Sequence, residues 1–309
     1  MAIMRAMLLA ASQNRWLRDH ASRYGFVKRS VSRFMPGENL QNAIAAAREL
    51  KKKNIASVLT HLGENVSDAS EAEHVTSHYL NVLETIHSEH MGIEISVKLS
   101  QLGLDLSPQL CEQNLRRLFA AEDGTKTLWI DMEASGYVDA TIKIYRKLLA
   151  DFPNAGICLQ AYLHRTASDI DSLLSMKPAI RLVKGAYAEM PALAIQEKKS
   201  IDTNYFVLGQ RLLRAQATGT VRRVAFATHD PKLIGLITDF ASAEAIPRGN
   251  VEVQMLYGIQ RAEQERLAKG GWRSGVLIAY GEYWYPWFLR RLAERPANLW
   301  LLLRNLAGT

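Results

Sequence analysis

The chain has 309 residues, of which 48% are apolar and 22% are charged, and this mixture excludes an intrinsically disordered protein. Its 38 lysines and arginines outnumber its 31 acidic residues, which gives a net charge of +7. The basic residues are spread in short clusters such as 51–53, which argues against a nucleic-acid-binding protein. An anionic substrate, a phosphate-bearing cofactor and an anionic membrane surface all remain suitable partners.

The two cysteines and the first residues bear on the compartment. Cys111 and Cys158 lie far apart without a metal-binding spacing, so we expect neither a disulfide framework nor a metal site. The apolar run over 6–11 is too short for a signal-peptide core or a membrane span. These features are typical of a cytoplasmic protein.

The first 53 residues predict a helical preface, with its clearest helix over 42–53. From residue 54 to 309, short apolar runs alternate with longer helical patterns. The predicted strands are 55–59, 93–99, 127–130, 156–160, 180–183, 223–227, 251–254 and 275–279. The predicted helices are 71–89, 108–121, 138–151, 195–216, 231–241 and 258–268, and a last helix begins near 284.

Eight strands that alternate with helices predict a closed (β/α)8 barrel over 54–309. The alternative is an open doubly wound sheet. Such a dinucleotide-binding sheet normally carries G-x-G-x-x-G after its first strand, and no two glycines in this chain are separated by a single residue. The barrel is therefore the favoured fold.

Polar residues gather at the carboxyl ends of the predicted strands, where barrel enzymes carry their active sites. They are Glu64, Lys98, Asp131, Glu133, Gln160, Arg181, Lys184, Tyr187, Thr228, His229 and Gln254. Buried charges need a partner, so this ring implies either mutual salt bridges or a bound ligand. We expect a direct contact between Lys98 and Asp131, which end neighbouring strands at the same depth.

Arg290 and Arg291 fall in the second turn of the last predicted helix, about 100° apart around its axis. Arginine binds carboxylates through two parallel hydrogen bonds, so the pair predicts a carboxylate clamp over the barrel mouth. The alternative is a solvated basic face that pairs with Glu282 and Glu294. Aromatic residues at 284, 285, 287 and 288 favour the clamp, because four rings make a poor water-facing stripe.

Eight motifs occur in order between about residue 55 and residue 300. They are LGENV (62–66), SVKLSQLGLD (96–105), IDMEASG (130–136), LQAYLHR (159–165), RLVKGAY (181–187), FATHD (226–230), VQMLYGI (253–259) and YGEYWYPWFLRRLAERP (280–296). Together they resemble the proline dehydrogenase family, flavoenzymes that oxidise proline to Δ1-pyrroline-5-carboxylate.

This resemblance implies a distorted (β/α)8 barrel that binds FAD without a covalent bond and carries its last helix over the barrel mouth. It places Arg181 near the flavin N5 and Gln160 against the isoalloxazine. The other residues implied for the cofactor are Lys184, Gly185, Ala186, Thr228, His229 and Gln254.

For the substrate, the resemblance implies that Arg290 and Arg291 bind the proline carboxylate together with Lys98, which Asp131 orients. Three further residues have implied roles: Tyr187 and Leu256 line the ring, and Glu64 pairs with Arg290 as an ionic gate. The implied chemistry is hydride transfer to the flavin N5, which needs no nucleophile. The implied electron acceptor is a quinone, and peripheral membrane contact stays open.

Three positions depart from the family pattern, and two of them concern the substrate ring. Leu277 and Trp287 stand where the family usually has tyrosines that face the substrate ring, and Asp230 replaces a common Asn. We therefore expect an intact flavin site with a substituted or larger cyclic imino acid as an alternative substrate.

Without the family resemblance, the residues themselves are also compatible with two other functions. A Schiff-base barrel lyase or aldolase would use Lys98 or Lys184. A non-catalytic binding protein would keep the carboxylate clamp without flavin chemistry.

Overall fold

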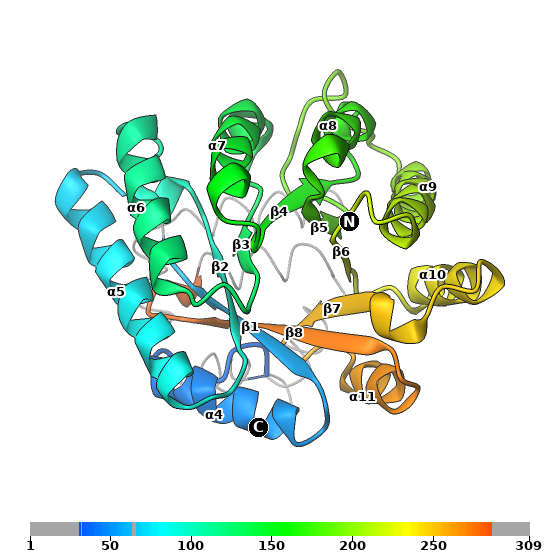
Figure 1. The fold of residues 1–309 in the computed structure, drawn as a ribbon, viewed down its shortest axis with the longest axis horizontal. Coiled ribbons are helices and arrows are strands. Elements are labelled where there is room, and N and C mark those ends of the chain that lie inside the picture. Colours follow the sequence, from blue (N-terminus) through cyan, green and yellow to red (C-terminus); the bar gives the residue numbers. More distant parts are fainter. Residues whose placement is uncertain (1–30, 32, 64–65, 286–309) are drawn as a thin grey trace, which may run out of the picture.

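Eight parallel strands close into a barrel in the order β1-β2-β3-β4-β5-β6-β7-β8, with helices around its outside (Figure 1). The computed structural model describes residues 31, 33–63 and 66–285. The strands are β1 (Ala56–His61), β2 (Glu94–Val97), β3 (Leu128–Ile130), β4 (Ala155–Gln160), β5 (Ala179–Val183), β6 (Arg223–Ala227), β7 (Glu252–Leu256) and β8 (Arg273–Tyr280). The predicted (β/α)8 fold is confirmed.

Helices α4 to α11 alternate with these strands. They are α4 (Leu40–Lys51), α5 (Ala69–Ser88), α6 (Pro108–Ala121), α7 (Val138–Asp151), α8 (Thr166–Leu173), α9 (Lys198–Ala217), α10 (Pro231–Ala243) and α11 (Arg261–Lys269). Short 3-10 helices are η1 (Ser100–Leu102), η2 (Ser135–Tyr137), η3 (Leu174–Met176) and η4 (Arg248–Asn250). None of the helices in the described ranges is both long and apolar enough to cross a membrane.

The predicted elements match the structure with a few differences. The second strand ends at Val97 rather than at 99 because η1 begins at Ser100. Helix α8 was not predicted, because two of its four buried residues, Thr166 and Asp169, are polar and hide the helical period. Most of the 1–53 preface and of the last predicted helix lies outside the described residues, so the domain division stays a prediction.

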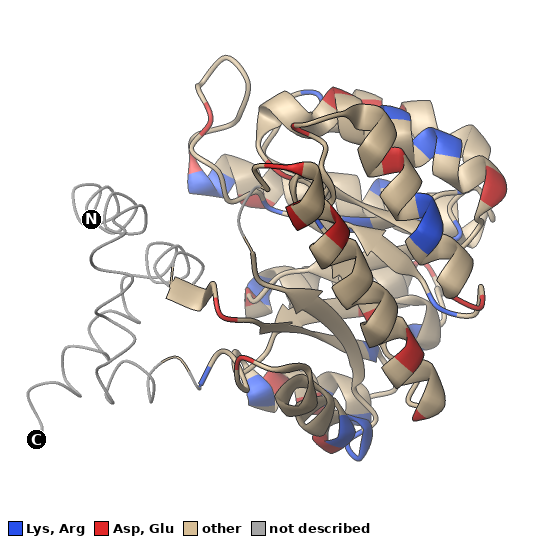
Figure 2. Cartoon of the chain, turned by 90° about the vertical axis from the view of Figure 1, so that its left-hand side faces the viewer, with Lys and Arg blue, Asp and Glu red and all other residues tan. Residues whose placement is uncertain are grey.

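Several helices begin where the local sequence dictates. Asp68 caps α5 by accepting from the backbone N–H of Glu71 at 3.0 Å. Ser107 caps α6, and a proline occupies the first turn of both α6 and α10. A capping oxygen satisfies an N–H that the helix leaves free, and proline loses no hydrogen bond there. In Figure 2 basic and acidic residues are interspersed on these outer helices.

Side chains alternate between the two faces of the barrel wall, as the period of two in a strand requires. Leu59, Ile95 and Ile130 belong to the large core between strands and helices. Val58 and Trp129 belong to a smaller cluster that fills the barrel interior. The interior is therefore packed and leaves functional groups only near its ends.

A buried ionic network closes the amino-terminal end of the barrel. The Arg223 guanidinium lies 2.5 Å from the Glu94 carboxylate and 2.7 Å from that of Glu252. The indole N–H of Trp129 donates to Glu94 at 2.8 Å. Burial alone would lower the pKa of Arg223, but the two carboxylates outweigh it and raise that pKa. The network therefore holds β2, β6 and β7 together.

Replacing Arg223 by alanine leaves two buried carboxylates without their cation. We expect the free energy of unfolding to fall by about 3–5 kcal/mol, measured by urea denaturation. The matched control is Arg214→Ala, which removes an exposed pair with Glu244 and should leave the free energy of unfolding close to the native value, because solvent screens the pair. Equal losses in the two variants would contradict a structural role for this network.

Candidate functional site

An ionic cluster lies in the barrel interior toward its carboxyl end. Asp131 directly follows β3, and its Oδ1 lies 3.1 Å from the Arg181 Nη1 of β5. The Ser96 hydroxyl of β2 donates to the same carboxylate oxygen at 2.8 Å and accepts from Arg181 at 3.0 Å. Three strands thus direct polar groups to one point inside the barrel.

Arg181 keeps donors that no described residue uses. The side chain is 3% exposed, and its Nε and Nη2 have no hydrogen-bond partner among the described residues. Its guanidinium carbon lies 4.4 Å from the centre of the Trp129 ring, a cation–π contact that fixes its plane. Buried donors without acceptors are costly, so this geometry favours a ligand at Arg181.

Two glutamines have buried acceptor atoms that lack a hydrogen-bond partner among the described residues. Gln160 ends β4 and donates from Nε2 to the Glu133 carbonyl oxygen at 3.2 Å, while its buried Oε1 is unpartnered among the described residues. Gln254 of β7 donates to Glu252 at 2.7 Å and likewise leaves Oε1 unpartnered within the described part. Donors from Arg181 and acceptors from the glutamines suit a flat ligand that carries both kinds of group.

Glu133 supports the loop after β3. Its carboxylate accepts from the backbone N–H of Ser100 at 2.9 Å and from the Ser100 hydroxyl at 2.5 Å. Burial raises the pKa of Glu133, although these two bonds oppose the shift. The residue thus connects the loop after β3 to the turn after β2 and has a positioning role.

A second charged cluster follows β5 and β6. The Lys184 ammonium lies 2.5 Å from the Asp202 carboxylate and 3.3 Å from that of Asp230. Lys198 pairs with both of these carboxylates as well. Burial tends to raise the pKa of Asp230, but the charge and hydrogen bond of Lys184 outweigh it and hold that pKa below its usual value. The sequence did not predict the two carboxylates around Lys184.

The comparisons with known proteins identify the family of the chain. A model of the family described as proline dehydrogenase matches residues 43–300. The chain belongs to the proline dehydrogenase family. It is 34% identical to proline dehydrogenase 1 of Bacillus subtilis over 305 residues, which cover 98% of this chain and 99% of that protein. It is 35% identical to the proline dehydrogenase of Deinococcus radiodurans over 282 residues, 89% of either chain.

A solved structure shares the fold. It is proline utilization A from Bdellovibrio bacteriovorus, inactivated by N-propargylglycine, with a TM-score of 0.79 and 23% identity. The match covers 86% of this chain and 32% of that protein. At this identity the likeness supports the barrel fold alone.

Several residues that the family resemblance implies for the cofactor surround the second charged cluster. His229 accepts through Nε2 from the backbone N–H of Leu256 at 2.9 Å, and the Thr228 hydroxyl is buried and accepts from the Asp230 N–H at 3.2 Å. Gly185 has φ +113°, and a Cβ there would lie 2.1 Å from the Tyr162 ring. Only glycine satisfies both conditions, so the backbone after β5 passes directly over Tyr162.

The residues implied for the substrate are placed less completely. Lys98 directly follows β2 and is half-buried, whereas Tyr187 is 38% exposed. Leu277 lies inside β8, not at its end, and packs on the interior cluster with Trp129. The expected contact of Lys98 with Asp131 stays a prediction.

The carboxylate clamp lies outside the described residues. Glu64, Trp287, Arg290 and Arg291 all fall in the ranges 64–65 and 286–309. Their predicted roles as gate, ring wall and clamp therefore stay predictions. Ala186, the neighbour of Gly185, is exposed.

The sequence reasoning missed a histidine cluster at the ends of β1 and β8. His61 ends β1, and its ring lies 4.2 Å from that of His78, which shares a hydrogen bond of 2.8 Å with the Tyr280 hydroxyl. Burial, then the neighbours His78, His74 and Lys98, lower the pKa of His61 to about 4. The signal was present, since Thr60-His61 repeats the Thr-His pair that marks the end of β6.

His61 should make the stability of the protein depend on pH. The unfolded chain binds a proton near the ordinary histidine pKa of 6.5, whereas the folded chain does so only near 4. The contribution of neutral His61 to the free energy of unfolding is therefore fully present above pH 6.5 and is lost as the pH falls toward 4.

Chemical denaturation at pH 7 and pH 4.5 measures this loss in the native protein and in His61→Gln. We expect the native protein to lose on the order of 2 kcal/mol more than the variant between the two pH values. His164→Gln, at an exposed loop position, is the control and should keep the native pH profile. A native-like profile in His61→Gln would refute the assignment.

Proposed function

We propose that this chain is an FAD-dependent proline dehydrogenase that oxidises L-proline, or a substituted cyclic imino acid, to the corresponding 1-pyrroline-5-carboxylate. Membership of the proline dehydrogenase family supports this function. The observation in the barrel that carries the proposal is a pair of buried side chains, Arg181 and Gln160. The Nε and Nη2 of Arg181 and the Oε1 of Gln160 all lack a hydrogen-bond partner among the described residues.

The donor set fits a flavin. An isoalloxazine presents carbonyl oxygens and ring nitrogens that accept hydrogen bonds, and an N–H that donates. Arg181 offers donors for the ring's oxygens and nitrogens, and the Oε1 atoms of Gln160 and Gln254 offer acceptors for its N–H. When bound, FAD supplies the hydride acceptor at its N5. Lys184, Gly185, Ala186, Thr228 and His229 complete the proposed cofactor site.

The protein's own residues supply charge and position. The Arg181 cation favours negative charge on a ring beside it, and Asp131 and Ser96 hold the guanidinium in one orientation. Lys98, Arg290 and Arg291 bind the substrate carboxylate, with Asp131 orienting Lys98. Positive charge around the substrate also favours the neutral amine, which is the form that gives up hydride. Tyr187 and Leu256 line the ring, and Glu64 pairs with Arg290 when the site closes.

The remaining alternatives are weaker. Family membership favours a dehydrogenase over a Schiff-base lyase with Lys98 or Lys184 and over a non-catalytic binding protein. Electrons from the reduced cofactor pass to a quinone in our proposal. The enzyme is then cytoplasmic and makes peripheral contact with an anionic membrane.

An anaerobic reduction experiment tests the proposal. The purified protein should be yellow, with absorption bands at about 380 and 450 nm that bleach on addition of a cyclic imino acid. In Arg181→Met we expect the rate of bleaching to fall by about 10²-fold, because the charge beside the ring is lost. Arg214→Met, at an exposed position on α9, is the control. A colourless protein that forms a borohydride-trapped adduct with its substrate would contradict the proposal.

Leu277 tests the substrate preference. Its side chain is partly buried on the interior cluster. In our proposal it leaves more apolar space for the substrate ring than a tyrosine would. We expect kcat/KM for methylproline or pipecolate to exceed that for proline, and Leu277→Tyr to reverse this order by about tenfold. Steady-state kinetics on proline, hydroxyproline, methylproline and pipecolate measure the preference. A clear preference of the native enzyme for plain proline would remove the hypothesis.

A further inference from the structure

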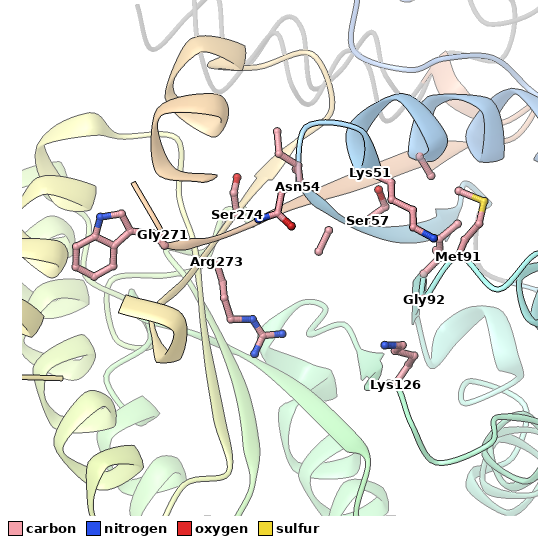
Figure 3. A pocket seen from close by; sticks show the side chains of 14 residues that line it. Lys51, Asn54, Ser57, Met91, Gly92, Lys126, Gly271, Arg273 and Ser274 are labelled. Carbon is pink, nitrogen blue, oxygen red and sulfur yellow. The ribbon is translucent and has the colours of Figure 1, made fainter. Parts of the chain in front are cut away.

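A cavity of about 360 Å³ opens at the amino-terminal end of the barrel, opposite to the site described above. It lies between the end of α4 and the first residues of β1 and β8, and Met91 and Lys126 from the neighbouring loops also line it (Figure 3). Cavities that bind small molecules have about this volume or more. No step of the proposed reaction uses it.

Three cationic side chains line this cavity. They are Lys51, Lys126 and Arg273, and no acidic residue is among the described residues that line it. In Figure 3 the Lys126 ammonium and the Arg273 guanidinium stand on opposite sides of the open space. The Lys51 ammonium donates one hydrogen bond to the His90 carbonyl oxygen at 3.2 Å, and the Arg273 guanidinium lies 3.5 Å from the Glu252 carboxylate. Among the described residues, two of the three ammonium protons of Lys51 therefore have no partner.

Two buried hydroxyls add a second, independent sign of a ligand. Ser57 and Ser274 are 5% and 3% exposed and line the cavity, yet their Oγ atoms have no hydrogen-bond partner among the described residues. They lie on the paired strands β1 and β8 and face α4, because their neighbour Val58 and the nearby Leu277 face the interior cluster. A buried hydroxyl without a partner costs free energy that an oxyanion would recover.

We propose that this cavity binds a small organic phosphate, held as a dianion by Lys51, Lys126 and Arg273 with hydrogen bonds from Ser57 and Ser274. Donors from several directions suit the tetrahedral oxygens of a phosphate. Lys51 and Lys126 match its two negative charges, and Arg273, which Glu252 partly neutralises, adds further donors. Ile55, Ile93 and Trp272 give the cavity an apolar wall that accepts the organic part. A monocarboxylate would use fewer of these donors.

Titration calorimetry on the purified protein tests this site with three probes: inorganic phosphate, phenyl phosphate and acetate. We expect saturable binding of both phosphates, tighter for phenyl phosphate, and at least tenfold weaker binding of acetate. Lys126→Gln should weaken phenyl phosphate binding by about tenfold or more, because a hydrogen bond to a charged group is lost. Ser274→Ala should weaken it by about threefold to tenfold.

Lys143→Gln is the matched control, since Lys143 is exposed on α7 and does not line the cavity. It should bind phenyl phosphate with the native Kd. Lys51→Gln, at an exposed end of α4, gives a second cavity variant that leaves the core untouched. Native Kd values in Lys126→Gln, Lys51→Gln and Ser274→Ala would overturn the proposal, as would acetate binding as tight as that of phosphate.

Discussion

Trp129 divides the interior of this barrel into two parts with different roles. Its ring lies 4.4 Å from the Arg181 guanidinium carbon and 5.1 Å from that of Arg223. A closed barrel of eight strands has room for only a few large side chains, so one indole occupies much of the available volume. Gly156 on β4 reflects this constraint, because a Cβ there would lie 2.6 Å from the Trp129 ring.

The two arginines beside Trp129 differ in how completely their hydrogen bonds are satisfied. Arg223 is paired with Glu94 and Glu252 and also donates to the Thr127 hydroxyl at 3.0 Å. Arg181 meets one carboxylate, that of Asp131, and keeps two nitrogens unpartnered among the described residues. A satisfied network stabilises the fold, whereas an incompletely satisfied one keeps binding capacity. The arginine with satisfied hydrogen bonds thus lies at the amino-terminal end of the barrel, and the arginine with unpartnered donors among the described residues lies toward its carboxyl end.

The fold could be predicted almost entirely from sequence. Each strand is a short apolar run, each helix except α8 carries a clear period, and the alternation of the two leaves few topologies. The residues at strand ends were equally visible, because their place in the chain fixes their place at the barrel mouth. His61 was missed although it obeys the same rule, and the place of Arg223 at the start of the predicted strand 223–227 did not reveal the two carboxylates that it meets.

The sequence by itself determined the family, the barrel and the strand-end residues, because hydrophobic period and motif order are local properties of the chain. Only the tertiary structure decided which charges meet. Asp131 pairs with Arg181, and Lys184 lies between Asp202 and Asp230, which come from segments 18 and 46 residues away. The unpartnered serines of the amino-terminal cavity were equally invisible in the sequence. Partners of this kind depend on barrel register and closure, which bring distant residues into contact and leave no trace in spacing along the chain.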